Sequence, residues 1–479
     1  MKSLDVPIIG DSKDAPQDDP EYTLNLYGEQ VSDEVYTLKP TPGSELYGQF
    51  AVGGGGRGLV TVGGRLFGVR GAYFQEMIDG EPLVRGSLLT NSAAKVAMVY
   101  HLPPNGNGQI LIVDETNGYV FELATNTFTV LAPPASPEDD GFVGGGCQAT
   151  YCAGRALVFI PGNRVIRCSE VNDFLIWPGL GTATAESLAT PLKAIASNGN
   201  LFYAFSDDGF EVWQFQDADQ FPFAPILSGD KIGILAPQSL LFIERFAYWL
   251  GRTDTGEGVV YRHSGGGQPE RISTHAYERR IADLSTPSDA IGCTYNSLGH
   301  TFYLLNFRAG NKTFCWDKAT SLWHDRAVRE PVSGNLSGLP WVATVVFEGE
   351  ILAIGYQSGQ VLHIDDELFT DTGNPILRER ILTVIPKEGD WLTYYQSAEL
   401  FGTVGNTPVG QQVPNIMMKY STDRGMTWSL ERWQSTGGNH SYGTRTRWVG
   451  LGAAFGLALW FRVVSSHFIS WRMVRVYAE

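Results

Sequence analysis

A two-strand phrase recurs along most of this chain and constrains its fold more than any other feature. Each copy has a turn, an apolar strand, a second turn and a second strand, as in 63–74 (GGRLFGVRGAYF) and 108–123 (GQILIVDETNGYVFEL). Copies follow one another about every 44 to 55 residues. The equivalent positions are Arg65, Gln109, Arg155, Asn200, Ala247, Phe302 and Glu350. A repeat of this length with two or more strands per unit is typical of β-propeller blades.

The repeat predicts an all-β fold with three parts. Residues 41–388 are expected to form a propeller, with seven blades favoured and six as the alternative, because one step of the repeat is longer than the others. Residues 389–479 have longer strands, which predicts a smaller β-sandwich or a strand set that also closes the propeller. Residues 1–40 contain DSKDAPQDDP, which is too polar to bury a core, so we expect an extended N-terminal arm that becomes ordered against a partner. Within the arm, Tyr22, Leu24, Leu26 and Tyr27 offer a short strand that is able to dock elsewhere.

Composition agrees with this and limits the function classes. The 479 residues carry a net charge of −16, which argues against ordinary binding to a phosphate backbone, although a channel for passing DNA remains compatible. The N-terminus is polar and shows no signal peptide. The longest apolar stretch, Val449–Trp460, is shorter than the ~20 residues that span a bilayer, so no membrane span is expected.

Cysteine and histidine spacing predicts neither a metal site nor a cofactor site. The five cysteines form no CxxC motif and lie mostly in or beside apolar strands, which favours buried, reduced thiols and folding in a reducing cytoplasm. The eight histidines are scattered and show no HxH or HExxH spacing. The glycine run 53–56 precedes a strand rather than a helix, so it is not a phosphate-binding loop.

The segment Ser421–Trp428 (STDRGMTW) fits the Asp-box pattern of sialidases and related propellers. In such a turn, Asp423 accepts backbone N–H groups, Gly425 takes a positive φ and Trp428 covers the base of the hairpin. The box is structural even in enzymes. Glycoside hydrolysis needs two carboxylates facing each other across a sugar, and the acidic pairs of this chain lie in turn-like contexts. We therefore predict no catalytic residue and no enzymatic activity.

Longer phrases give a specific family resemblance. They are YWLGRTDTGEGVVYRHSGGGQPERISTHAYE (Tyr248–Glu278), GHTFYLL (Gly299–Leu305) and FCWDKATSLWHDR (Phe314–Arg326). These resemble the packaged-DNA-stabilising tail hub, or nozzle, proteins of short-tailed bacteriophages. The resemblance runs from about residue 41 to the end of the chain. It departs from the family at Cys315, where an aromatic or aliphatic residue is usual, and in the weakly matching arm.

The resemblance implies a structural protein of the virion tail, assembled in the host cytoplasm. Such hubs form a ring, expected to be a hexamer, below the portal and its adaptor. They extend and close the DNA channel, retain the packaged double-stranded DNA without reading its sequence, and anchor the tail needle, tailspike or fibres. No catalytic, metal or cofactor residue comes with the resemblance.

The family phrases are interpreted as structural elements of the blades. Arg271 and Glu278 are expected to pair with neighbouring backbone or charged groups, Asp317 to begin the DKAT turn, and Trp323 to pack beneath that turn. The alternative from another class is a carbohydrate-active propeller, either a tail depolymerase or a sialidase-like glycosidase. A generic protein-interaction propeller is a third possibility, but the chain has no WD or kelch signature.

Overall fold

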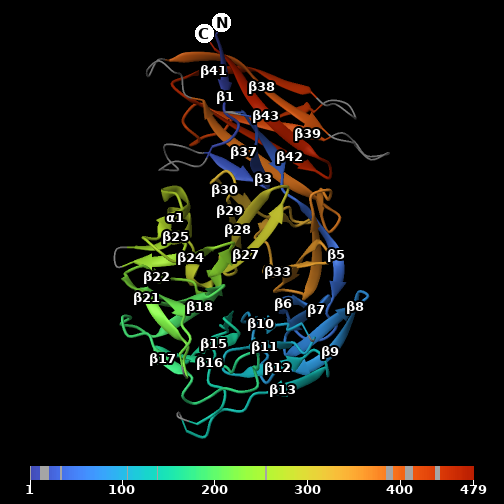
Figure 1. Ribbon diagram of the computed structural model, residues 1–479. Coiled ribbons are helices and arrows are strands. Elements are labelled where there is room, and N and C mark those ends of the chain that lie inside the picture. The colour runs from blue at the N-terminus through green and yellow to red at the C-terminus, as the bar shows by residue number, and fades with distance from the viewer. Residues whose placement is uncertain are drawn as a thin grey trace.

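The computed structural model consists of a propeller and a β-sandwich, with both chain ends at the sandwich (Figure 1). It describes residues 2–10, 21–32, 35–104, 106–136, 139–218, 220–253, 256–384, 392–404, 414–436 and 443–478. The predicted all-β class, a propeller with a C-terminal sandwich, is confirmed. The described helical elements are α1 (His275–Ala282) and two short 3-10 turns, η1 (Pro237–Ser239) and η2 (Pro287–Asp289).

Within the described residues, the strands of the propeller form antiparallel groups around its axis, and neighbouring strands of each group mostly follow one another in the chain. The first four are formed by β6 (Gly56–Val62), β7 (Arg65–Arg70), β8 (Tyr73–Ile78) and β9 (Glu81–Ser87); β10 (Ala97–His101), β11 (Gln109–Val113), β12 (Gly118–Glu122) and β13 (Thr127–Val130); β14 (Thr150–Cys152), β15 (Arg155–Phe159), β16 (Val165–Cys168) and β17 (Thr182–Thr184); and β18 (Leu192–Asn198), β19 (Leu201–Ser206), β20 (Phe210–Phe215) and β21 (Phe223–Asp230).

The last three sheets complete the circle. They are formed by β22 (Gly233–Ile234), β23 (Leu241–Ile243), β24 (Phe246–Thr253), β25 (Gly256–His263) and β26 (Glu270–Arg271); β27 (Ile291–Ser297), β28 (His300–Phe307), β29 (Lys312–Asp317) and β30 (Trp323–Arg326); and β33 (Trp341–Phe347), β34 (Glu350–Gly355) and β35 (Gln360–Asp365) with β5 (Gly43–Gln49). A small hairpin, β31 (Val328–Arg329) and β32 (Leu336–Ser337), links the last two sheets.

An N-terminal strand closes the propeller. β5 pairs antiparallel with β35, from Gly43 opposite Asp365 to Gln49 opposite Gln360, and so completes the last sheet. β33 contacts both β27 of the preceding sheet and β6 of the first sheet. Main-chain hydrogen bonds therefore hold the two ends of the propeller together, and β35 is not left as a free sheet edge.

The repeat positions found in the sequence lie on equivalent strands. In every sheet the repeat position falls within two residues of the start of the strand that follows the innermost one, namely β7, β11, β15, β19, β24, β28 and β34. These strands are covered on both faces by the neighbouring sheets, and Gln109–Val113 is buried along its whole length. A strand buried on both faces has a continuous run of apolar residues, so the repeat is easiest to recognise in the sequence of these strands.

Aromatic side chains fill the space between adjacent sheets. Between the first two sheets, Phe67, Phe74 and Phe121 form a buried cluster with ring centroids 5.2 to 5.4 Å apart. Close packing also explains a glycine inside a strand. A Cβ atom at Gly68 would lie 2.3 Å from the ring of Phe50, so only glycine leaves room for that ring.

The second domain consists of two stacked sheets. The first has β1 (Lys2–Val6) and β4 (Val35–Pro40) paired to β43 (Ile469–Ala478), followed by β38 (Thr393–Val404) and β41 (Thr444–Ala454), with β3 (Leu26–Ser32) beyond β4. The second contains β2 (Tyr22–Leu24), β37 (Asn374–Val384), β42 (Leu457–Ser465), β39 (Asn415–Ser421) and β40 (Arg432–Ser435). Trp448, Phe461 and Trp471 are buried between the two sheets.

The N-terminal segment differs from the expected extended arm. β1 to β4 are strands of the sandwich, and Ile8, Leu24 and Leu26 are buried. The polar stretch 11–20, on which the expectation of an arm was based, lies outside the described residues. The segments on either side of it have enough apolar side chains to bury, so they add strands to the sandwich.

The boundary between the domains also differs from the expected position after residue 388. The last strand of the propeller, β35, ends at Asp365, whereas β37 starts at Asn374 and pairs with β42 from Ile376 opposite Ser465 to Val384 opposite Leu457. Residues 374–384 are therefore part of the sandwich. Strand patterning looks the same in a blade and in a sandwich, so the sequence did not distinguish them.

We expect Ile8→Ala to lower the free energy of unfolding by about 2–5 kcal/mol, because a buried side chain is replaced by a cavity. Ile8 is 2% exposed and lies in the core of the sandwich. Urea denaturation followed by tryptophan fluorescence measures the loss. Val332 is 96% exposed, so Val332→Ala is the control and should change stability by no more than about 0.5 kcal/mol. Equal effects of the two substitutions would contradict the docking of the N-terminal segment.

Candidate functional site

Two of the three phrases that carry the family resemblance contact each other. Residues 270–280 contain β26 and most of α1, and residues 314–326 contain the end of β29 and all of β30. The indole N–H of Trp323 donates to the carbonyl oxygen of Ile272 at 2.8 Å, and its ring lies against Tyr277 with centroids 5.1 Å apart. Trp323 is buried and thereby joins two neighbouring sheets of the propeller.

Arg271 and Glu278 pair with each other. Arg271 Nε donates to Glu278 Oε1 at 2.7 Å, and its Nη2 lies 2.5 Å from Oε2 and 2.9 Å from His275 Nδ1. The hydroxyl of Ser273 donates to the same carboxylate at 2.6 Å. Glu278 lies in the first turn of α1, where a negative charge is favourable. The pair fixes the start of the helix, although the exposure of Arg271 keeps its contribution to stability to about 1 kcal/mol or less.

Asp317 lies in the DKAT turn and also begins a chain of polar contacts. Its carboxylate accepts the backbone N–H of Ala319 at 2.9 Å, the hydroxyl of Thr320 at 2.7 Å and a contact from His300 Nδ1 at 2.8 Å. His300 Nε2 lies 2.8 Å from Glu29 Oε2 on β3. The chain Asp317–His300–Glu29 therefore connects the propeller to the sandwich.

The contacts among Asp317, His300 and Glu29 shift the pKa values of His300 and Asp317. Burial disfavours the imidazolium of His300, but the carboxylates of Asp317 and Glu29 outweigh that effect and raise its pKa. Burial also works against the carboxylate of Asp317, yet its bonds to His300 and Thr320 hold its pKa below the usual value. Both ring nitrogens of His300 are occupied by carboxylates, so this histidine is not placed to take a proton from a substrate.

An ion pair between a partly exposed arginine and a buried aspartate marks the place where the propeller meets the sandwich. Arg280 bonds to Asp325 through both terminal nitrogens, one of them at 3.0 Å, and the hydroxyl of Tyr277 donates to the same carboxylate at 3.2 Å. Arg280 also faces the ring of Tyr22 on β2, 5.7 Å from its centroid. Leu24 of β2 lies opposite Asp325 of β30, so the sheet of the blade continues through β2 into β37 of the sandwich.

Asn25 connects three parts of the chain, and the sequence analysis missed it. Its side-chain amide donates to the carbonyl oxygens of Ala327 and Leu377, both at 2.8 Å, and its side-chain oxygen accepts the N–H of Ala327 at 3.0 Å. Its backbone has a φ of +52°, a conformation that asparagine tolerates better than most residues. The sequence shows only a single asparagine between two leucines, and this pattern does not identify the distant residues to which Asn25 bonds.

Arg380 fixes the N-terminal segment on the sandwich. Its buried guanidinium donates to the carbonyl oxygens of Ile8 at 2.8 Å and Gly10 at 3.3 Å, and it contacts Thr23 at 3.1 Å and Glu21 at 3.0 Å. The sequence does carry a signal here, because RER stands in the middle of an apolar strand. Charged residues are almost never buried without partners, so such a run predicts a polar junction.

The Asp-box hairpin lies between β39 and β40 of the sandwich. Asp423 accepts the hydroxyl of Ser421 at 2.6 Å, and the N–H and hydroxyl of Thr427 at 2.8 and 2.5 Å. These hydrogen bonds lower the pKa of Asp423 to about 2. Gly425 has a φ of +90° and donates to Ser421 Oγ at 2.8 Å. Trp428 packs edge-on against Trp460 with centroids 5.4 Å apart. The carboxylate is engaged within its own turn.

The propeller axis holds a cavity of about 360 Å³, lined by the innermost strands. Its lining includes Lys95, Gln148, Ser197, Cys293 and Thr344. This is the volume of a small-molecule pocket, which a DNA duplex cannot enter.

The cysteine thiols are buried, and the Asp208 carboxylate is hydrogen-bonded to neighbouring hydroxyls. All five cysteines are buried, and burial raises the pKa of Cys147 and Cys152 to about 12, which disfavours the nucleophilic thiolate. Asp208 accepts the hydroxyls of Thr190 and Ser206 within a turn. No group of three or more His, Cys, Asp or Glu side chains in the described part of the chain is arranged to hold a metal ion. No described helix is long and apolar enough to cross a membrane.

We expect Arg280→Met to cost about 3–5 kcal/mol of stability, because it leaves the carboxylate of Asp325 buried without its arginine. Chemical denaturation measures the change. Arg279→Met at the exposed neighbouring position is the matched control and should be nearly neutral. The double variant Arg280→Met/Asp325→Asn should recover part of the loss. If Arg280→Met is as mild as the control, the ion pair does not hold this junction.

His300 should make stability depend on pH. Its folded-state pKa is raised, so its contribution is fully present below the unfolded-state pKa of about 6.5 and is lost as the pH rises through the folded-state value. The difference in Tm between the natural chain and His300→Gln should therefore be largest near pH 6 and shrink toward pH 9. Thermal melts followed by circular dichroism test this. A difference that grows with pH would show that the carboxylates do not stabilise the imidazolium.

The solved structures described next are similar to the chain only with TM-scores below 0.5. The extracellular domain of a hybrid two-component system from B. thetaiotaomicron is 8% identical over 67% of this chain and 39% of that chain, with a TM-score of 0.43. The N-terminal domain of Nup159 is 11% identical over 72% and 98%, with a TM-score of 0.39. An exo-β-1,3-galactanase from Phanerochaete chrysosporium is 8% identical over 92% and 100%, with a TM-score of 0.27. No functional inference follows from these similarities.

Two family models match the chain in tandem. The model described as Bacteriophage P22 Gp10, beta-propeller, matches residues 35–364, and the model described as Bacteriophage P22 Gp10, beta-sandwich, matches residues 378–479. A comparison with curated protein sequences gave no match. The first range covers the propeller and more than half of the chain, and the second covers the C-terminal strands of the sandwich. The chain therefore belongs to the bacteriophage P22 Gp10 family of structural tail proteins, the tail hubs that stabilise packaged DNA.

Proposed function

We propose that this protein is the hub, or nozzle, of a short-tailed phage. Several copies, six by the family resemblance, form a ring below the portal and its adaptor, continue the DNA channel and close it until ejection. Assembly takes place in the host cytoplasm, and the protein then resides in the virion tail. The tandem family matches carry this proposal, since together they cover both domains.

The polar junction between the domains supports a role in which the two domains keep a fixed arrangement under mechanical force. Domains of one chain usually move relative to each other unless their interface is extensive. Here β2 pairs with both β30 and β37, and Asn25 bonds to both domains, so hydrogen bonds run from the propeller into the sandwich. A subunit braced in this way is suited to hold its shape against the pressure of packaged DNA.

The charge balance supports a channel through which DNA slides. Each contact between a phosphate and a lysine or arginine adds affinity, and tight binding would oppose ejection. The net charge of −16 keeps such contacts few. Retention would then depend on a narrow passage and on a plugging protein. The partners we propose are further copies of the chain, the portal–adaptor complex, and a tail needle, tailspike or fibre.

The carbohydrate-active alternative has weaker support. Its specific observation is the Asp-box hairpin, whose Asp423 carboxylate is bonded within the turn. The hairpin also lies in the sandwich rather than in the propeller. A tail depolymerase or sialidase-like activity therefore remains the second candidate.

Mixing the purified protein with its portal–adaptor complex should give a ring coaxial with the channel in electron micrographs and a matching mass increase by mass photometry. Duplex DNA should bind the isolated protein weakly, without a steep dependence on salt, because few basic groups face the phosphates. The portal complex without adaptor is the control. Failure to assemble, combined with hydrolysis of a capsule polymer or sialoside, would favour the alternative.

A further inference from the structure

The outer face of the β1–β43–β38–β41 sheet carries an arginine-rich surface, which we call the arginine face. It consists of Arg445, Arg447, Arg472 and Arg475. The strand register places Asp5, Arg475, Glu399 and Arg447 in one row across the four strands, with alternating charge.

Both carboxylates of the row are already paired. Asp5 accepts two bonds from Arg475, at 2.5 and 3.0 Å. The side chain of Glu399 is fully covered and contacts Arg445, Arg447 and the hydroxyl of Tyr477. The face therefore has two arginines more than carboxylates. Arg445 and Arg447 are about half exposed, so their remaining N–H donors are open to a partner.

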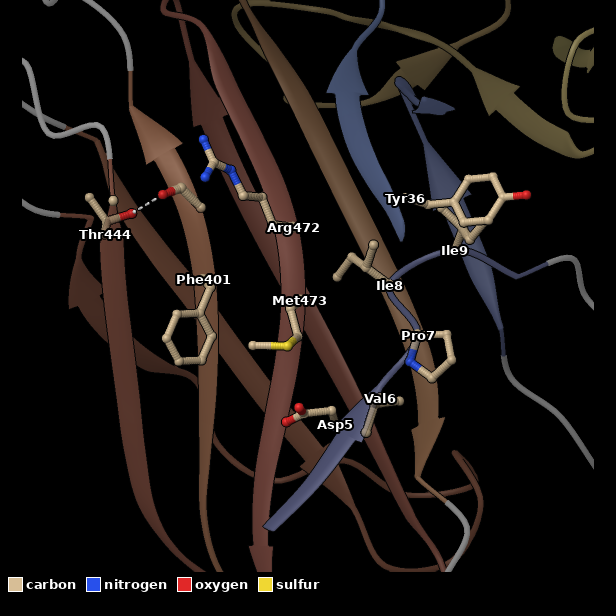
Figure 2. A pocket seen from close by; sticks show the side chains of 12 residues that line it. Asp5, Val6, Pro7, Ile8, Ile9, Tyr36, Phe401, Thr444, Arg472 and Met473 are labelled. Atoms are coloured by element: carbon tan, nitrogen blue, oxygen red, sulfur yellow. Dashed lines mark hydrogen bonds between the residues drawn. The ribbon is translucent and has the colours of Figure 1, made fainter. Parts of the chain in front are cut away.

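An apolar groove of about 520 Å³ lies beside the arginine face (Figure 2). The N-terminal segment forms one side of it, and β38 and β43 form the other. Its apolar lining includes Val6, Pro7, Ile9, Tyr36, Phe401 and Met473. Figure 2 shows the Phe401 ring next to the Met473 side chain, with Arg472 on the same side of the groove and Asp5 near its end. Arg472 and the carboxylate of Asp5, which is paired with Arg475, thus border a space that takes an apolar side chain.

We propose that this surface binds an extended acidic segment of another protein. Carboxylates of the segment bond to the arginine face, and an apolar side chain enters the groove between Phe401 and the N-terminal segment. Arginine suits this role because its planar guanidinium matches a carboxylate with two parallel bonds. The proposal does not depend on the role of the chain in a tail.

The surface favours a polypeptide over nucleic acid. A phosphate backbone has no apolar side chain to fill the groove, and Asp5, about half exposed within the charged row, would repel a phosphate. An acidic peptide places its carboxylates in discrete positions and can avoid Asp5. Charge complementarity to the arginine excess and apolar complementarity to the groove therefore select the same class of partner.

The test uses the full chain and a labelled peptide in which Glu-Glu-Phe is repeated four times, with binding followed by fluorescence anisotropy at low salt. Arg445→Ser/Arg472→Ser should weaken binding at least tenfold. Glu399 keeps Arg447 and Tyr477 in this variant, so no buried carboxylate loses all its partners. The matched control is Arg245→Ser/Arg279→Ser, which removes two exposed arginines from the propeller and should leave binding unchanged within about twofold.

Phe401→Ser tests the groove separately. It should weaken binding of the Glu-Glu-Phe peptide more than that of a Glu-Glu-Ser peptide, and circular dichroism checks that each variant is folded. The proposal is overturned if the natural chain binds no acidic peptide, or if the arginine-face variant and its control bind equally. It is also overturned if a duplex of about 20 base pairs binds instead and loses affinity in the arginine-face variant, because the surface would then recognise nucleic acid.

Discussion

Pairing between the first fifty residues and strands from the far end of the chain holds both domains together. β5 pairs with β35 and closes the propeller, while β1 pairs with β43 and β2 with β37 to complete the sandwich. Each pairing is a ladder of main-chain hydrogen bonds, which covers strands that would otherwise be open edges. The chain therefore has to bring its two ends together before either domain is complete.

This constraint explains the concentration of buried polar groups at the junction. A strand that passes between two domains brings main-chain groups and charged side chains into positions without water, and each then needs a partner. The side chains of Asn25 and Arg380 donate to main-chain carbonyl oxygens there, and the partly exposed Arg280 pairs with the buried carboxylate of Asp325. Side chains of the family phrases also form contacts at this joint, such as the hydrogen bond of Trp323 to Ile272 and the bond of Asp325 to Arg280.

The sequence predicted those features whose partners lie close along the chain. The repeat of turn and apolar strand located the second strand of each sheet, because that strand is buried on both faces wherever it occurs. The Asp-box turn involves residues within a few positions of each other, so local chemistry was sufficient to propose its hydrogen bonds. Arg271 and Glu278 were expected to pair with neighbouring backbone or charged groups, and their pairing with each other was not foreseen. By contrast, the same strand pattern suits a blade or a sandwich, and β37 was assigned to the wrong domain for this reason.

By itself, the sequence determined the all-β class, the repeating propeller and the presence of a different C-terminal domain, because these follow from local periodicity and turn chemistry. Its phrases also indicated the family. Only the tertiary structure decided that the N-terminal segment belongs to the sandwich, that Asn25 bridges the domains, and that four arginines share one face beside an apolar groove. These features depend on strands that are hundreds of residues apart in the chain, and strand register across such distances is set by the packing of the whole fold rather than by any local pattern.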